Sequence, residues 1–151
     1  MCVQQSDTNV FSPHTVERLI IEGCTLTESY HGLSPLTVAA SKGHSACVAV
    51  LVKYGAEPAR WACGSTALHE AAYSGQYETV QLLLKMGSNV RALNSRGMDA
   101  LDVSQARMCQ LNNGPSSVAN LFTLKQIRKV IRVLKTHRSR RKRGGAACAV
   151  Q

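Results

Sequence analysis

The stretch GSTALHEAAYSGQYETVQLLLKMG, residues 64–87, decides the fold, because the chain repeats its pattern on both sides. Residues 32–55 read GLSPLTVAASKGHSACVAVLVKYG, and GMDALDVSQAR at 97–107 begins a third copy. The glycines that open the copies are 32 and 33 residues apart, and the closing glycines, counted from Gly23, recur every 32 residues. Self-similarity at this period predicts a solenoid of stacked structural units.

Each copy predicts a pair of short helices. Leu68, Ala71 and Ala72 lie at helical spacing in the first helix, and Gly75 follows where a left-handed residue ends a helix well. The run VQLLL at 80–84 gives the second helix an apolar stripe between polar residues. Such a pair cannot bury its apolar face alone, so it must stack on further copies of itself.

The repeated unit resembles the ankyrin repeat, whose pattern runs G-x-T-P-L-H-x-A-A-x-x-G-H before a Leu-rich helix and a G-A-D/N turn. Two departures stand out, since Thr37 replaces the usual His and Ala67 the usual Pro. The resemblance implies an all-α ankyrin-repeat solenoid with two full repeats between partial capping repeats. The matching residues are Gly32, Ser34, Pro35, Leu36, Ala39, Ala40, Gly43 and His44, then Gly64, Thr66, Leu68, His69, Ala71, Ala72 and Gly75.

The expected domain organisation places all repeats before a basic C-terminal end. We expect a disordered N-terminus at 1–12, ankyrin repeats at 13–107 and an inserted loop at 108–117, where Asn-Gly-Pro predicts a turn. A basic capping helix is expected at 118–136, with Leu121, Leu124, Ile127, Ile131 and Leu134 on one face and Lys125, Arg128, Lys129, Arg132 and Lys135 facing water. Residues 137–151 are expected to be a disordered basic tail.

The net charge of +9 comes entirely from one end of the chain. Residues 1–120 hold eight Lys/Arg and all nine Asp/Glu, whereas residues 121–151 hold ten Lys/Arg and no acid. The repeats are therefore nearly neutral, and the excess charge belongs to the C-terminal segment.

The six cysteines show neither CxxC nor CxxH spacing, so we expect no metal site and no cofactor. The first residues are polar and resemble no secretory signal, and no apolar run is long enough to span a membrane. Reduced thiols in the cytoplasm, with the nucleus as the alternative, are the expectation.

We expect no enzymatic activity. His69 in TALH is interpreted as a residue that ties adjacent repeats together by hydrogen bonds, as the resemblance implies, and Glu70 beside it cannot face it on a helix. Cys47 occupies an apolar helix position and is interpreted as core packing.

The resemblance implies a concave protein-binding surface, made by the turn tips and the exposed side of each first helix. We expect a monomer that binds a protein partner there. Exposed Trp and Tyr side chains are typical interface anchors, although Trp61 has the alternative of covering a neighbouring turn. The expected binding residues are Tyr30, His31, Leu33, Ser41, Lys42, Trp61, Ser65, Tyr73, Ser74, Arg96 and Met98.

The basic tail, Lys135, Arg138, Arg140, Arg141, Lys142 and Arg143, has three interpretations: a nuclear localisation signal, a patch for an anionic membrane surface, or a solvated end. The tail lacks interleaved aromatic residues, which argues against base-stacking recognition of single-stranded nucleic acid, and nucleic acid is not the partner we expect. The last four residues, CAVQ, resemble a C-a-a-X prenylation box, which predicts farnesylation of Cys148. A polybasic segment upstream is the second signal that a single prenyl chain needs for stable anchoring.

The sequence thus predicts a non-catalytic adaptor or regulatory protein, tethered to membranes if Cys148 is prenylated. One alternative is a substrate receptor of a ubiquitin ligase, because TLKQIRKVIRVL at 123–134 partly resembles the S/T-L-x-x-L-C-R-x-x-I-R helix of a SOCS box. The other alternative is a nuclear regulator that uses the tail for import.

Overall fold

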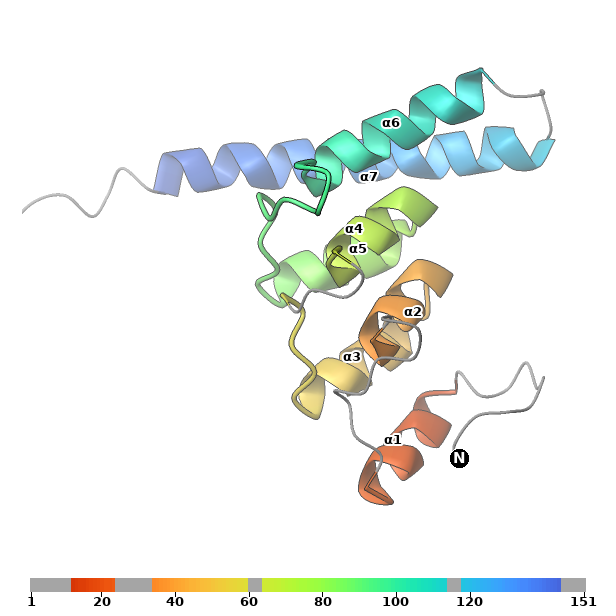
Figure 1. The fold of residues 1–151 in the computed structure, drawn as a ribbon, viewed down its shortest axis with the longest axis vertical. Helices are drawn as coiled ribbons and strands as arrows, with labels where there is room; N and C mark the ends of the chain where they lie inside the picture. The colour runs from red at the N-terminus through yellow and green to blue at the C-terminus, as the bar shows by residue number, and fades with distance from the viewer. Residues whose placement is uncertain (1–11, 24–33, 60–63, 114–117, 145–151) are drawn as a thin grey trace, which may run out of the picture.

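A computed structural model describes residues 12–23, 34–59, 64–113 and 118–144. Every helix or strand assigned in these ranges is an α-helix, and the helices stack in pairs along one axis (Figure 1). The all-α repeat fold expected from the sequence is confirmed. In chain order the helices are α1 (Pro13–Ile21), α2 (Pro35–Lys42), α3 (Ser45–Lys53), α4 (Ala67–Ser74), α5 (Tyr77–Lys85), α6 (Ala100–Asn112) and α7 (Val118–Gly144).

The helices form two layers. The inner layer consists of α2, α4 and α6, since α4 contacts both α2 and α6. The outer layer consists of α1, α3, α5 and α7, each packed against the next. Each repeat contributes one helix to each layer, and α1 alone lacks an inner partner among the described residues.

Local sequence fixes where each inner helix begins and ends. Ser34 caps α2, because its hydroxyl accepts a hydrogen bond from the backbone N–H of Thr37 at 3.2 Å, and Pro35 takes the first helical position. Gly75 ends α4 with φ at +75°, and a Cβ built there would lie 3.0 Å from Cγ1 of Ile127. Glycine at this position therefore permits both the turn and the close approach of α7.

The core runs through both layers and includes α7. Ala39, Ala40, Ala71 and Ala72 are at most 1% exposed, and these small side chains let the inner helices approach closely. From the outer layer, the apolar residues at most 3% exposed are Cys47, Val48, Leu51, Val80, Leu83, Ile127, Val130 and Leu134. The expected closing helix is therefore part of the stack.

The expected loop at 108–117 is wrong in its first half, because α6 continues to Asn112. No Gly or Pro interrupts the chain before Gly114, and Met108 and Leu111 pack against the core. Apolar contact with the stack thus extends the helix past the point where the repeat pattern fades. Residues 114–117 lie outside the described part of the chain.

The expected disorder from residue 137 onward is also wrong as far as Gly144, where α7 ends. Lys and Arg are good helix formers, and cations are favourable near the C-terminus of a helix. Arg138 is held by Asp99, the residue that caps α6, with Nη1 and Oδ2 3.0 Å apart. Residues 145–151, Cys148 among them, and residues 1–11 lie outside the described ranges.

Candidate functional site

The structure divides the expected binding residues between the two ends of the inner helices. Ser41, Lys42, Tyr73 and Ser74 lie at the C-terminal ends of α2 and α4. Ser65 lies in the turn before α4, and Arg96 and Met98 in the turn before α6. The other four, Tyr30, His31, Leu33 and Trp61, lie outside the described residues.

The helix-end group is centred on Tyr73. Its side chain is 41% exposed, and the guanidinium carbon of Arg107, from α6, lies 4.8 Å from the centre of its ring. Lys42 is exposed on the neighbouring α2, and the side-chain amide of Gln76 donates to the carbonyl oxygen of Ser41 at 3.4 Å. Three consecutive inner helices thus present an aromatic ring and two cations to solvent. We call Ser41, Lys42, Tyr73, Ser74 and Arg107 the inner-helix site.

Arg107 was missed as a site residue. The sequence pattern of the third copy ends at this position, so nothing placed its side chain beside Tyr73. One signal could have found it: Arg107 stands one position later in its copy than Tyr73 does in its own, counted from Gly97 and Gly64. That position is equivalent to Ser74, the last residue of α4, so Arg107 lies on the next inner helix beside the end of α4 that carries Tyr73.

The turn group is ordered by backbone contacts between successive repeats. The N–H of Ser95 donates to the carbonyl of Gly64 at 2.7 Å, which joins the turn before α6 to the turn before α4. The side-chain oxygen of Asn94 accepts from the N–H groups of Arg96 at 2.9 Å and Met98 at 3.0 Å. Ser65 is half-buried and Arg96 is exposed, so of these two only Arg96 offers a fully accessible side chain.

His69 links an inner helix to the turn of the next repeat. Its Nδ1 accepts from the backbone N–H of Thr66 at 3.3 Å and lies 2.8 Å from the Thr66 hydroxyl, while Nε2 donates to the carbonyl of Met98 at 3.1 Å. Burial lowers the pKa of His69 below 6.5, outweighing the backbone carbonyls and acidic groups that favour protonation. Both ring nitrogens are engaged in the neutral form, so the inter-repeat role expected for His69 is confirmed.

Thr37 occupies the equivalent position one repeat earlier. Its hydroxyl lies 2.7 Å from that of Ser34, inside its own helix start. The side chain is buried and too short to reach as far as a histidine does. The departure from the family pattern at this position thus replaces an inter-repeat contact by a local one.

The described residues show neither a reactive cysteine nor a cluster of metal ligands. Cys47 is 1% exposed, and burial raises the pKa of its thiol, which disfavours the reactive thiolate. No group of three or more potential metal ligands occurs in the described ranges. None of the helices described there is long and apolar enough to cross a membrane.

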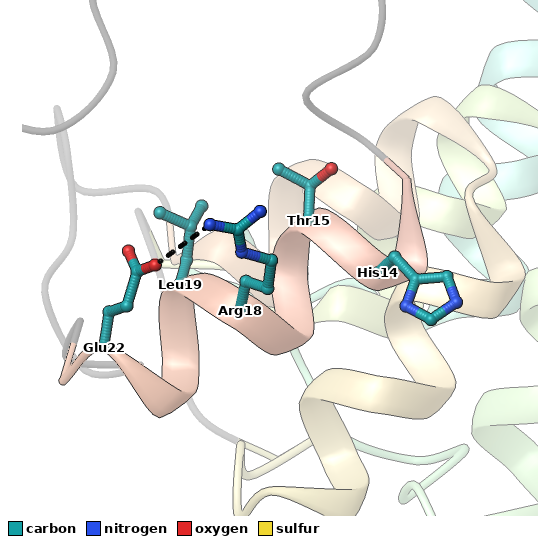
Figure 2. Close-up of a pocket in the computed structure, with 5 residues that line it drawn as sticks. All are labelled: His14, Thr15, Arg18, Leu19 and Glu22. Atoms are coloured by element: carbon teal, nitrogen blue, oxygen red, sulfur yellow. Dashed lines mark ion pairs between the residues drawn. The ribbon is translucent and has the colours of Figure 1, made fainter.

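A surface pocket of about 360 Å³ lies along α1, and the described residues that line it belong to that helix and to Glu22 at its C-terminal cap (Figure 2). Arg18 and Glu22 form an exposed ion pair in it, with Nη2 and Oε1 3.6 Å apart. His14 lies at the other end of the lining, and Thr15 and Leu19 complete it. An exposed ion pair on a single helix contributes little binding energy, so we assign no function to this pocket.

A family model described as "Ankyrin repeats (3 copies)" matches residues 6–94, more than half of the chain. The chain belongs to the ankyrin-repeat family. The matched segment holds the helices from α1 to α5, and the structure adds α6 and α7 as a further helix pair packed on the same stack. Ankyrin repeats indicate binding of a protein partner.

Ankyrin relatives among well-described proteins are much longer than this chain. Ankyrin repeat and SOCS box protein 16 of Homo sapiens is 34% identical over 76 residues, which are 50% of this chain and 17% of the relative. E3 ubiquitin-protein ligase XBAT33 of Arabidopsis thaliana is 47% identical over 58 residues, 38% of this chain and 11% of the relative. Inactive serine/threonine-protein kinase TEX14 of Mus musculus is 37% identical over 93 residues, 58% of this chain and 6% of the relative.

The basic residues that follow the ankyrin core differ in their surroundings. Lys135 is exposed, whereas the guanidinium of Arg138 is paired with the carboxylate of Asp99, which is 7% exposed. Arg138 is therefore committed to the fold and is not a free tail cation. Arg140, Arg141, Lys142 and Arg143 continue α7, and their side chains lie outside the description.

Proposed function

We propose that this chain is a non-catalytic adaptor or regulatory protein that binds a protein partner through the inner-helix site. The observation that carries the proposal is the Tyr73–Arg107 pair, with 4.8 Å between ring centre and guanidinium carbon. Tyrosine and arginine are enriched among the residues that dominate binding energy at interfaces. Stacking holds both side chains in place before binding, which lowers the entropic cost of ordering them at an interface.

The chain offers a matched control for this pair. Lys53 lies over the ring of Tyr54, 5.5 Å from its centre, and Tyr54 is 39% exposed at the end of the outer helix α3. The two tyrosines have similar exposure and each carries a stacked cation, but they belong to different layers. A protein that binds the inner layer should therefore lose affinity when Tyr73 is replaced but not when Tyr54 is replaced.

We expect Tyr73→Ala and Arg107→Ala each to weaken the partner by more than about 1 kcal/mol, or about fivefold in affinity. Tyr54→Ala and Lys53→Ala should leave binding within about twofold. Quantitative affinity purification of the whole chain from cells, followed by titration of the recovered partner, measures the affinity of the inner-pair and the outer-pair variants. Equal loss with both pairs of variants, or loss with the outer pair alone, would overturn the assignment.

A second candidate function, substrate reception for a ubiquitin ligase, is favoured by the names of several relatives. The structure argues against this function, because the helix that resembles a SOCS-box helix is not free to bind ligase subunits. Leu124, Ile127, Ile131 and Leu134 of the segment 123–134 are buried against the ankyrin stack, at most 9% exposed. An apolar stripe committed to the core is not available to ligase subunits, so we favour the adaptor. Elongin and cullin subunits among the purified partners would reverse that preference.

We also propose that Cys148 is farnesylated and that the chain is a cytoplasmic protein held at membranes. The support is the C-terminal CAVQ together with the polybasic residues before it. Intact mass spectrometry of protein from eukaryotic cells should show a prenylated chain that ends at residue 148. A chain that still ends in Gln151 without added mass would leave nuclear import as the better interpretation of the basic tail.

A further inference from the structure

The solvent side of α7 carries two exposed apolar residues near the start of the helix, followed by a row of basic residues. Leu121 and Phe122 are each 64% exposed near the start of the helix. The cations that follow them are all exposed: Lys125, Arg128, Lys129, Arg132 and Lys135. We call these seven residues the α7 face.

Helical spacing and exposure together place the α7 face on the solvent side of the helix, away from its buried stripe. The buried positions Leu124, Ile127, Ile131 and Leu134 recur every three or four residues, as do Lys125, Arg128, Arg132 and Lys135 one position later. The buried side faces α4, α5 and α6, so the α7 face points away from the stack. In Figure 1, α7 lies at the end of the stack opposite α1.

The α7 face is not neutralised by the rest of the described structure. Residues 121–151 contain no Asp or Glu, and within the described ranges none of the five cations pairs with a carboxylate. The amino group of Lys129 lies 5.8 Å from the ring centre of Tyr77, a contact that leaves its charge intact. The ion pair that α7 makes with the stack, between Arg138 and Asp99, involves none of these five cations.

We propose that the α7 face binds the surface of an anionic lipid bilayer, with α7 lying in the plane of the membrane. From Leu121 to Lys135 the helix rises about 21 Å, which spreads the five charges over several headgroups. Exposed Leu and Phe side chains insert at the boundary between headgroups and acyl chains, where a nucleic acid backbone offers them no apolar medium. The combination of both on one helical face favours lipid as the partner.

This inference is independent of the inner-helix site and of Cys148. The inner-helix site lies on α2, α4 and α6, so a membrane on the far side of α7 leaves it accessible. A chain produced in bacteria carries no prenyl group and isolates the contribution of the helix. The test therefore uses the bacterial full-length chain with phosphatidylcholine vesicles, prepared with and without phosphatidylserine.

The chain should co-sediment with the vesicles that contain phosphatidylserine and much less with those that do not. Lys125→Gln, Arg128→Gln and Arg132→Gln combined should weaken binding about 100-fold, because each basic residue near an anionic surface contributes about fivefold. The matched control combines Lys53→Gln, Lys85→Gln and Arg91→Gln, three exposed cations outside α7, and should bind like the unchanged chain. Added salt should weaken binding of the unchanged chain.

Replacing Leu121 and Phe122 with serine keeps every charge and tests the apolar part separately. We expect roughly tenfold weaker binding, the equivalent of about two buried CH₂ groups, with a salt dependence as steep as that of the unchanged chain because every charge remains. Circular dichroism checks that each variant folds. Equal sedimentation with both kinds of vesicle would overturn the proposal, as would equal binding by the α7 variant and its control. It would also fall if only neutralising Arg140–Arg143 releases the chain, or if duplex DNA binds the α7 face and vesicles do not.

Discussion

Replacing Leu134 with alanine is expected to lower the free energy of unfolding by about 2–5 kcal/mol. Leu134 is 0% exposed, and it lies in α7, well beyond the segment that the family model matches. Alanine would leave a cavity between α7 and the rest of the stack, which neighbouring side chains fill only in part. Urea unfolding followed by circular dichroism measures the change.

Leu121→Ala is the matched control, because it makes the same substitution in the same helix at a side chain that is 64% exposed. Its cost should stay within about 0.5 kcal/mol. If the two variants unfold alike, α7 is not part of the cooperative core, and the closing position assigned to it is wrong.

Replacing His69 with alanine should cost about 2–4 kcal/mol. The substitution leaves the Met98 carbonyl without its histidine donor and Thr66 without its partner, each at or near a buried site, and it opens a cavity. His14→Ala, at an exposed residue of α1, should be nearly neutral in the same unfolding experiment. A cost for His69→Ala as small as that of His14→Ala would contradict the bridging role.

The same residue predicts a dependence on pH. Because burial lowers the pKa of His69 below 6.5, the unfolded chain takes up a proton there before the folded chain does. Stability from this residue is complete above about pH 6.5 and declines as the pH falls toward the folded-state pKa, by at most about 1.4 kcal/mol per pH unit. The stability gap between the unchanged chain and His69→Ala should therefore narrow below that pH. A gap that stays constant or widens would contradict the assignment.

The repeated units were predictable because their signals are local and occur in more than one copy. Gly43 and Gly75 both have positive φ and end inner helices, and the alanine pairs before them are buried. The role of His69 followed from the family resemblance, and its hydrogen bonds confirm it. The closing position of α7 followed from an apolar stripe at helical spacing.

The errors arose where long-range contacts extend local structure. Met108 and Leu111 pack against the core, so α6 continues through a segment whose local sequence predicted a loop. The ion pair between Asp99 and Arg138 joins residues 39 positions apart, so no local sequence pattern could predict it. The binding residues were harder still to predict, because Arg107 belongs to the site only through its stacking on the ring of Tyr73, which lies on another helix.

The central claim, that a protein partner lies on the inner-helix site, is tested most directly by photo-crosslinking in cells. A photoreactive phenylalanine analogue replaces either Tyr73 or Tyr54, two tyrosines that are 41% and 39% exposed in different layers. Irradiation should produce a discrete covalent adduct with another protein from position 73 and none from position 54. An adduct from position 54 with none from position 73 would contradict the account.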